Sequence, residues 1–387
     1  MKKLLALLLA VAMLFSLAAC GGGDSADFKV GFICLHDEKS TYDLNFLNGV
    51  DEVKAALGLT DDQVIVMTNI PEGDECYQAA ADLVDQGCDV IFANSFGHED
   101  FMIKAAKEFP KVEFCHATGT KAHVENLANY HNAFASIYQG RYLAGIAAGM
   151  KLNEMINAGT IKANEAKMGY VGAFTYAEVV SGYTSFYLGA KSVCPSVTME
   201  VQFTGSWYDV NEEKNAAEAL IAKKCVLISQ HADSMGAPSA CEAAGVPNVS
   251  YNGSTVAACP NTFIVSSRIN WAPYFKYMIE TAKADGEIDV DWCGGLAEGS
   301  VVLTEINEKA AAAGTADAIK TATEGLKNGT VNVFDTNNFT VGGAKLTSHK
   351  VEGNEVIDNG IFKESMIMSA PYFDLRIDGI TLLNEKY

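Results

Sequence analysis

The sequence predicts an α/β protein of two lobes, each a doubly wound parallel β-sheet with helices on both faces. Two patterns and the chain length predict this class. Runs that are apolar at every position alternate with segments whose apolar residues recur at helical spacing, which is typical of buried parallel strands and their crossover helices. The alternation extends from residue 28 to about 150 and begins again near residue 166. A chain of 387 residues also exceeds the usual size of one domain.

The first half of the chain alternates between strands and helices. Apolar runs predict strands at residues 28–35, 63–70, 89–95, 112–118 and 126–132. Helical spacing predicts one helix that ends at Gly58, a second that ends at Gly87, and a third that ends before Pro110. A longer helix is expected at 134–150, where small residues permit close packing.

The second half repeats this order. Strands are expected at residues 166–174, 196–207, 225–234, 248–254 and 262–270. The helices between them include 180–193 and one that follows Asp209, where Glu212 completes a capping box. Residues 330–375 are rich in β-branched residues and turn dipeptides, so we expect hairpins added to one lobe. Two such lobes form a cleft between the carboxyl ends of their strands, where ligands bind in parallel sheets.

The first 20 residues are similar to a bacterial secretory signal. Two lysines precede an apolar run too short to span a membrane, and the run ends in LAAC, which resembles a lipobox. We therefore expect residues 1–19 to be a signal peptide, Cys20 to carry the lipid anchor, and residues 20–27 to form a flexible lipidated tether. The alternative is an ordinary cleavage site in which the cysteine is incidental. The folded part of the chain is expected at the cell membrane, on its extracytoplasmic face.

Composition excludes several classes of partner and site. The chain has 48 acidic and 28 basic side chains and a net charge of −20, which disfavours nucleic acid and anionic lipid as partners. Ten cysteines without a Cys-x-x-Cys pair, several of them in apolar strands, indicate buried thiols rather than a disulfide framework or a zinc site. We expect no metal and no cofactor.

Polar and aromatic side chains gather where the predicted strands end. One such residue alone is most often a helix cap, but here several neighbouring strand ends carry them. Aromatic faces together with carboxylates and amides suit a flat heterocycle that offers hydroxyl or N–H donors. These strand ends are His36-Asp37 with Tyr42-Asp43, Asn94 to His98, Gly205 to Asp209, Gln230 to Ser234, and Tyr251 to Ser254.

Several of these segments, taken in order, resemble the basic membrane protein family of PnrA-like lipoproteins. They are Ser40-x-Tyr42-Asp43-x-Asn45, ANSFGHEDFM at 93–102, FASIYQGRYLAGIAAG at 134–149, GSWYD at 205–209 and SQHADS at 229–234. The resemblance extends from residue 28 to about 300. It implies a type I periplasmic-binding-protein fold with three crossings between its lobes. The implied function is that of the solute-binding component of an ABC importer that takes a purine nucleoside or a related nucleobase.

The resemblance also implies roles for individual residues. Tyr42 and Trp207 would stack on the base, and Asp233 would accept hydrogen bonds from the ribose. Asp43 and Asn45 stand near the polar contacts to the base edge. The lysine that the family often has after its last long strand has no clear counterpart here. The nearest candidate is Arg268, which Asn270 and Trp271 follow. The expected ligand-binding set is Tyr42, Asp43, Asn45, Phe96, Trp207, Asp233, Asn252, Arg268 and Trp271.

The resemblance implies how the lobes divide the chain. We expect residues 28–135 and about 262–298 in the first lobe, and residues 136–261 and about 299–387 in the second, with a C-terminal β-rich extension. The implied partners are a small-molecule ligand, the permease and ATPase subunits of the importer, and the membrane through the lipid anchor. The protein is expected to be a monomer.

Three alternatives stay open. A sugar-binding protein of the same fold also lines its cleft with Trp, Asp and Asn, because aromatic rings stack on sugar faces. A ligand-sensing lipoprotein would use the same cleft for signalling. An enzyme is disfavoured because G-x-S-x-G, H-E-x-x-H and P-loop motifs are missing, and because His36, His98 and His231 lack the short spacing of a metal site. We therefore expect a binding protein without catalytic activity.

Overall fold

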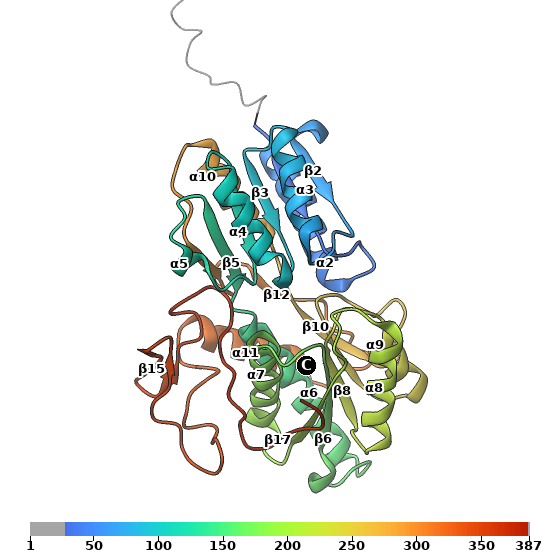
Figure 1. Ribbon diagram of the computed structural model, residues 1–387. Coiled ribbons are helices and arrows are strands. Elements are labelled where there is room, and N and C mark those ends of the chain that lie inside the picture. The colour runs from blue at the N-terminus through green and yellow to red at the C-terminus, as the bar shows by residue number, and fades with distance from the viewer. Residues whose placement is uncertain (1–27, 386–387) are drawn as a thin grey trace, which may run out of the picture.

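The computed structural model describes residues 28–385, and in this range the chain forms two α/β lobes (Figure 1). The first lobe is built on a six-stranded sheet whose strands all pair in parallel with their neighbours. In spatial order the strands are β2 (Val64–Met67), β1 (Val30–Ile33), β3 (Val90–Ala93), β4 (Glu113–Ala117), β5 (Tyr130–Ala135) and β11 (Asp291–Gly294). Every residue of β1, β3 and β5 is buried, as expected for strands covered on both faces.

Helices cover both faces of this sheet. On one face α2 packs against α10, and on the other α3 packs against α4. Ser40 begins α2 as its N-cap, because its hydroxyl accepts a hydrogen bond from the backbone N–H of Asp43. Gly58 ends the same helix in the left-handed conformation (φ +64°), as the sequence predicted. The helices are α2 (Thr41–Leu57), α3 (Asp74–Asp85), α4 (Glu99–Glu108), α5 (Ala122–Glu125) and α10 (Ala272–Lys283).

The second lobe is built on a seven-stranded sheet that is parallel except for β12. In spatial order its strands are β12 (Val301–Leu303), β10 (Phe263–Ile269), β9 (Asn248–Tyr251), β8 (Leu227–His231), β6 (Lys167–Gly172), β7 (Thr198–Phe203) and β17 (Ile380–Leu382). Its helices are α6 (Ile137–Asn157), α7 (Ala177–Val193), α8 (Val210–Ala222), α9 (Gly236–Ala244) and α11 (Thr315–Lys327). The prediction of two doubly wound parallel-sheet lobes of the type I periplasmic-binding-protein class is confirmed.

The chain passes between the lobes three times within the described residues. The crossings lie between β5 and α6, between β10 and α10, and between β11 and β12. We expected the chain to return to the first lobe near residue 262, and this boundary is wrong. The strand β10 pairs in parallel with β9 of the second sheet, so the return follows Ile269.

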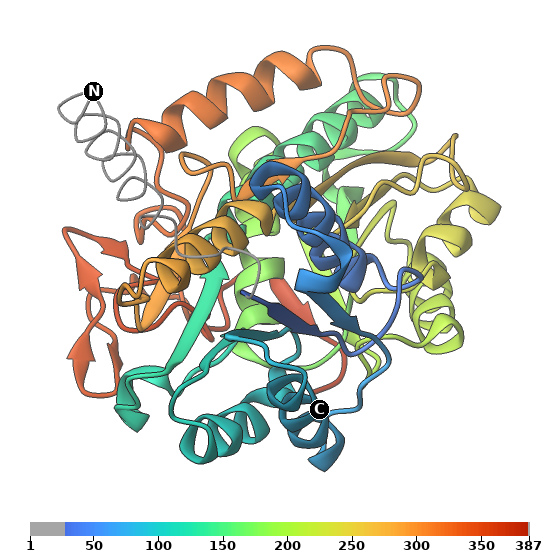
Figure 2. The ribbon, with the colours of Figure 1, turned by 90° about the horizontal axis from the view of Figure 1, so that it is seen from above.

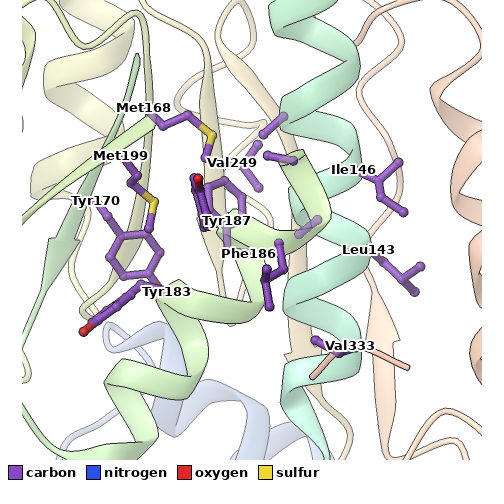
Figure 3. Close-up of a cluster of buried hydrophobic side chains, with 14 of the residues drawn as sticks. Leu143, Ile146, Met168, Tyr170, Tyr183, Phe186, Tyr187, Met199, Val249 and Val333 are labelled. Atoms are coloured by element: carbon purple, nitrogen blue, oxygen red, sulfur yellow. The ribbon is translucent and has the colours of Figure 1, made fainter. Parts of the chain in front are cut away.

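Two helices pack unusually closely in the core of the second lobe. Gly145 of α6 lies so near α7 that an added Cβ would be 2.0 Å from the carbonyl oxygen of Phe186. Reciprocally, a Cβ on Gly189 of α7 would lie 2.0 Å from the carbonyl oxygen of Tyr142. Figure 3 shows Tyr183, Phe186 and Tyr187 of α7 between α6 and the strands, among the largest buried side chains of this core. The small residues of the long helix predicted at 134–150 therefore permit this close packing of α6 on α7.

The C-terminal extension forms short hairpins, as predicted, and also elements that we did not predict. The hairpins are β13 (Lys350–Val351) with β14 (Asn354–Glu355), and β15 (Ile357–Asp358) with β16 (Ile361–Phe362). The extension packs on the core of the second lobe, yet Figure 2 shows the hairpins beside α5 of the first lobe. There His123 Nε2 lies 2.9 Å from Glu352 Oε2, and the N–H of Ser369 donates to Asp291. The strand β17 returns to pair with β7.

All nine cysteines among residues 28–385 are free thiols, and eight of them are buried. This confirms the expectation of buried thiols in the described part of the chain. None of the helices in this part is long and apolar enough to cross a membrane. The predicted signal peptide, Cys20 and the tether lie outside the described residues.

Candidate functional site

The carboxyl ends of the strands of both lobes face one narrow cavity, in which the space open to the centre of a water molecule is about 20 Å³. Four of its lining residues, Tyr42, Phe96, Trp207 and Asp233, belong to the expected ligand-binding set. No lysine or arginine is among the lining residues. The first lobe contributes Leu35, His36, Tyr42, Ser95, Phe96 and Thr118, and the second contributes Glu178, Trp207, His231 and Asp233.

Tyr42 is held in place at the wall of the first lobe. Its hydroxyl donates a hydrogen bond to the carbonyl oxygen of Asn94 at the end of β3 (2.7 Å). Its ring packs edge-to-face on Phe46, with centroids 4.8 Å apart. A ring fixed at both ends loses little conformational entropy when it stacks on a ligand.

Aromatic rings of the two lobes meet at the cavity. Phe96 lies in a single 3₁₀ turn, Phe96–His98, between β3 and α4, and its ring stacks on Tyr176 of the second lobe at 4.8 Å. Tyr176 stacks in turn on Phe174 at 5.0 Å, and Phe174 packs edge-to-face on Trp207 at 5.0 Å. The loop after β6 and the loop after β7 thus form one aromatic wall with the first lobe.

Asp233 is buried at the junction of the lobes. Its Oδ1 accepts a hydrogen bond from Asn252 Nδ2 (3.2 Å), and its backbone carbonyl accepts from the N–H of Thr41 in the first lobe (3.1 Å). Burial raises the pKa of Asp233 well above its usual value, and the nearby carboxylates of Glu213 and Asp43 raise it further. The described residues give its second carboxyl oxygen no partner.

Asp43 does not line the cavity and instead fixes the loop after β1. It is fully buried, and its carboxylate accepts hydrogen bonds from Ser40 Oγ (2.6 Å), Asn94 Nδ2 (2.7 Å) and the N–H of His36 (3.1 Å). Burial raises the pKa of Asp43, but the hydrogen bond with the His36 side chain, together with those from Ser40, Asn94 and the N–H of His36, outweighs burial and holds the pKa below its usual value. The carboxylate also faces His36 Nδ1 at 3.4 Å, which orients that cavity residue.

Asn45 and Asn252 also lie behind the cavity rather than in its wall. Asn45 Nδ2 donates to Asn252 Oδ1 across the lobes (3.4 Å), and Asn252 Nδ2 donates to Asp233. Asn252 adopts the left-handed conformation (φ +64°), which asparagine tolerates better than most residues. These two amides position Asp233.

Two further residues of the expected set lie away from the cavity. Trp271 is 1% exposed and stacks on Phe46 at 4.5 Å, so it belongs to the core of the first lobe. Arg268 is half-buried on β10, where its backbone pairs with Val302 of β12. Arg268 lies within β10 and Trp271 follows this strand at the crossing. The register of that crossing is what sequence similarity alone left open.

Six cavity residues were absent from the expected set. Five of them lie at the end of a strand or within three residues of it, and the strand ends marked in the sequence already contain His36, Ser95 and His231. Glu178 is the exception, because it lies in the first turn of α7 and no strand end or motif marks it. Among residues 28–385, no group of three or more His, Cys, Asp or Glu side chains is placed to hold a metal ion. The six are Leu35, His36, Ser95, Thr118, Glu178 and His231.

Comparisons with known proteins agree with this architecture. Residues 36–333 match the family described as ABC transporter substrate-binding protein, PnrA-like. A purine-binding protein of Brucella abortus is 33% identical over 269 residues, which cover 68% of this chain and 71% of that protein. A Haloferax volcanii protein named as a candidate ABC transporter glucose-binding protein is 34% identical over 218 residues, covering 56% of this chain and 52% of that one.

A solved structure supports the fold independently of close sequence similarity. The solute-binding protein of an ABC transporter system from Conexibacter woesei superposes with a TM-score of 0.64 at 19% identity. The match covers 79% of this chain and 98% of that one. With the family match over most of the chain, these findings show that the protein belongs to the PnrA-like family of ABC transporter substrate-binding proteins.

Proposed function

We propose that this protein binds a purine, as a nucleoside or a free base, in the cavity between its lobes and delivers it to an ABC permease. The observation that carries the proposal is the cavity lining, in which aromatic rings from both lobes stand beside two carboxylates. Purine rings stack on aromatic side chains, and their N–H groups and ribose hydroxyls donate to carboxylates. The name of the Brucella abortus relative supports the same class of ligand.

The charge of the cavity disfavours phosphorylated forms of the ligand. Glu178 and Asp233 line it, and no lysine or arginine does. A phosphate would meet the carboxyl groups of Glu178 and Asp233 in a poorly hydrated space, without a cationic partner among the lining residues. We therefore expect nucleosides and bases to bind and nucleoside monophosphates to be rejected.

Calorimetric titration of the purified protein tests the proposal. Adenine, adenosine, 2′-deoxyadenosine and adenosine monophosphate form a series in which one chemical group changes at a time. If Asp233 accepts the ribose hydroxyls, adenosine binds more tightly than 2′-deoxyadenosine, because a hydrogen bond contributes about 0.5–1.5 kcal/mol, and more where the acceptor is charged. Equal binding of adenine and adenosine would identify a free base as the ligand, and no binding of any purine would contradict the proposal.

A sugar is the second candidate ligand. The name of the Haloferax volcanii relative favours it, and Trp207 with Asp233 suits a sugar face and its hydroxyls as well. Glucose therefore belongs in the same titration. Binding of glucose without binding of any purine would replace the first proposal by the second.

We further propose that Cys20 carries a lipid that holds the protein at the extracytoplasmic face of the cell membrane. The LAAC sequence and the apolar run before it support this. Replacing Cys20 with serine is expected to release the protein from the membrane pellet into the soluble fraction, which immunoblotting of the two fractions measures. A variant that stays in the pellet after a high-salt wash would contradict the lipid anchor.

The remaining roles follow from the family. We propose that the protein acts as a monomer, without catalytic activity, together with permease and ATPase subunits. A sensing role for the same cleft would leave ligand binding intact but would not require these subunits. Uptake of labelled adenosine by cells that lack this protein separates the two roles, since loss of uptake indicates transport.

A further inference from the structure

Glu178 is the second carboxyl side chain at the cavity and, like Asp233, it has one side-chain partner among the described residues. It lies in the first turn of α7, where the positive end of the helix dipole stabilises a negative charge. Its side chain is 11% exposed, and Oε1 lies 3.4 Å from His231 Nε2. In the described part of the chain this is its only hydrogen-bonding or ion-pair partner. A carboxylate accepts about four hydrogen bonds, so most of the capacity of Glu178 is free.

His231, which holds Glu178, is neutral and fixed. Burial lowers the pKa of His231 and outweighs the opposite effect of Glu178, and the positive charge of Arg141 adds to the lowering. A neutral imidazole carries one N–H. Among residues 28–385 its Nδ1 has no hydrogen-bond partner, and it lies against α7, where a Cβ added to Gly182 would be 2.7 Å away. The proton therefore belongs on Nε2, which donates to Glu178.

Neighbouring rings keep His231 from rotating. Its centroid lies 4.6 Å from that of Tyr251 and 6.5 Å from that of Trp207. Behind Tyr251, the buried guanidinium of Arg141 lies 4.6 Å from the ring centroid and has no carboxylate partner among residues 28–385. Glu178 thus lines the cavity with Oε1 on a fixed His231, and its other carboxylate oxygen has no partner among residues 28–385.

We propose that Glu178 is a specificity-determining residue that accepts a hydrogen bond from an N–H group of the purine ring or its amino substituent. This rests on the proposed function. Because His231 fixes Glu178 as an acceptor, a ligand that presents a lone pair at this position is rejected, and one that presents an N–H is selected. The ligand class is narrowed to heterocycles with an N–H donor on the edge that faces α7.

The alternative role of Glu178 is structural, as the partner of His231 alone. Replacing Glu178 with glutamine separates the two roles. His231 Nε2 still donates to the amide oxygen of the glutamine, so the structural contact survives. The amide NH₂ group then faces the cavity in place of Oε2 and meets the N–H of the ligand, donor against donor.

The experiment is a calorimetric titration of adenine and adenosine into the wild type, Glu178→Gln and a control, Glu364→Gln. Glu364 is a buried carboxyl near Ser181 of α7 that does not line the cavity. We expect Glu178→Gln to weaken binding roughly 10- to 100-fold, as for a lost hydrogen bond to a charged group, and the control to leave it unchanged. Thermal unfolding without ligand checks that each variant is folded.

Three outcomes are distinguishable. Wild-type protein that binds neither ligand contradicts the proposed function rather than the role of Glu178. Wild-type protein that binds, with equal affinity in Glu178→Gln, overturns the specificity role. If Glu178→Gln does not fold, Glu178→Asp replaces it. This variant keeps the charge but withdraws the acceptor from the ligand, and unchanged affinity in it also overturns the role.

Discussion

Trp207 and Asp233 face the cavity from beyond the ends of β7 and β8, which lie on either side of β6 in the second sheet, one as an apolar surface and the other as a hydrogen-bond acceptor. Each was identified by its place directly after a strand. Their immediate neighbours in the wall, Tyr42 and Phe96, come from the other lobe. A ligand in the cavity would therefore contact side chains from both halves of the fold.

Replacing Trp207 with alanine tests the aromatic wall. If the ring stacks on the ligand, binding of adenosine weakens by roughly 1–3 kcal/mol, the contribution of base–aromatic stacking, while the unliganded protein stays folded. Calorimetry measures the first effect and thermal unfolding the second. The matched control is Trp292→Ala on β11, a tryptophan whose ring packs on Tyr277 away from the cavity. Unchanged affinity in Trp207→Ala would exclude stacking.

Sequence analysis predicted the site residues that follow the end of a strand. It misplaced those whose position depends on packing in the folded protein. Trp271 was expected at the ligand, yet it stacks on Phe46 in the core, because a large ring after the crossing is more stable buried than exposed. Asp43 was expected at the base edge, but its three donors turn it inward. His36 and Ser40 are near Asp43 in the sequence, but Asn94 comes from the end of β3, and no local pattern reveals that partner.

At the scale of the elements, close packing of α6 on α7 sets the frame of the second lobe. Gly145→Ala is expected to destabilise the protein by roughly 1–3 kcal/mol or more, because its Cβ would lie 2.0 Å from a backbone oxygen that cannot move by itself. The higher helix propensity of alanine compared with glycine offsets about 1 kcal/mol of this destabilisation. Urea unfolding measures the change, and Glu154→Ala on the exposed side of α6 is the control. Equal stability of the two variants would show that the helices tolerate a wider spacing.

Two buried histidines at the ends of β3 and β4 make the first lobe sensitive to acid. Burial lowers the pKa of His98 and of His116 to about 4, so both rings are neutral in the folded protein. In the unfolded chain they gain a proton below about pH 6.5. The pKa of each histidine is lower in the folded protein than in the unfolded chain. Their contribution to the free energy of unfolding is therefore fully present above about pH 6.5. It is lost as the pH falls toward 4, by up to about 3 kcal/mol each.

The test compares the wild type with His116→Gln by urea unfolding between pH 7 and pH 4.5. The comparison is needed because burial raises the pKa of Glu213 to about 7 and of Glu364 to about 8, and these groups favour folding as the pH falls. The wild type is expected to lose more stability than the variant below pH 6.5. Parallel loss in both proteins would mean that His116 is charged in the folded state.

The sequence predicted long apolar elements well and short or polar ones poorly. The strands from β1 to β10 lie where apolar runs indicated, except that β5 begins four residues later than expected, and the long helix α6 begins at Ile137 instead of 134 and continues to Asn157. The strands β11, β12 and β17 have three or four residues each and are held by pairing with distant strands. The return of the chain to the first lobe was set too early because β10, an apolar strand beside a crossing, fits either sheet by pattern alone.

At the scale of the whole molecule, direct contacts join the two lobes around the cavity. Thr41 of the first lobe donates to the backbone of Asp233, Phe96 stacks on Tyr176, and Asn45 donates to Asn252. A ligand held between the lobes would add contacts to both, so binding and the association of the lobes are coupled. The family match gives this coupling its purpose, because a substrate-binding protein of an ABC transporter presents its ligand to a permease.

The central claim is that a purine binds between the two lobes, and a crystal structure of the protein with adenosine or adenine tests it most directly. We expect the purine ring between the aromatic side chains Tyr42 and Phe96 of the first lobe and Trp207 of the second. Asp233 and Glu178 should accept hydrogen bonds from the ligand. A purine bound outside this cavity, or inside it without contact to either carboxylate, would contradict the account.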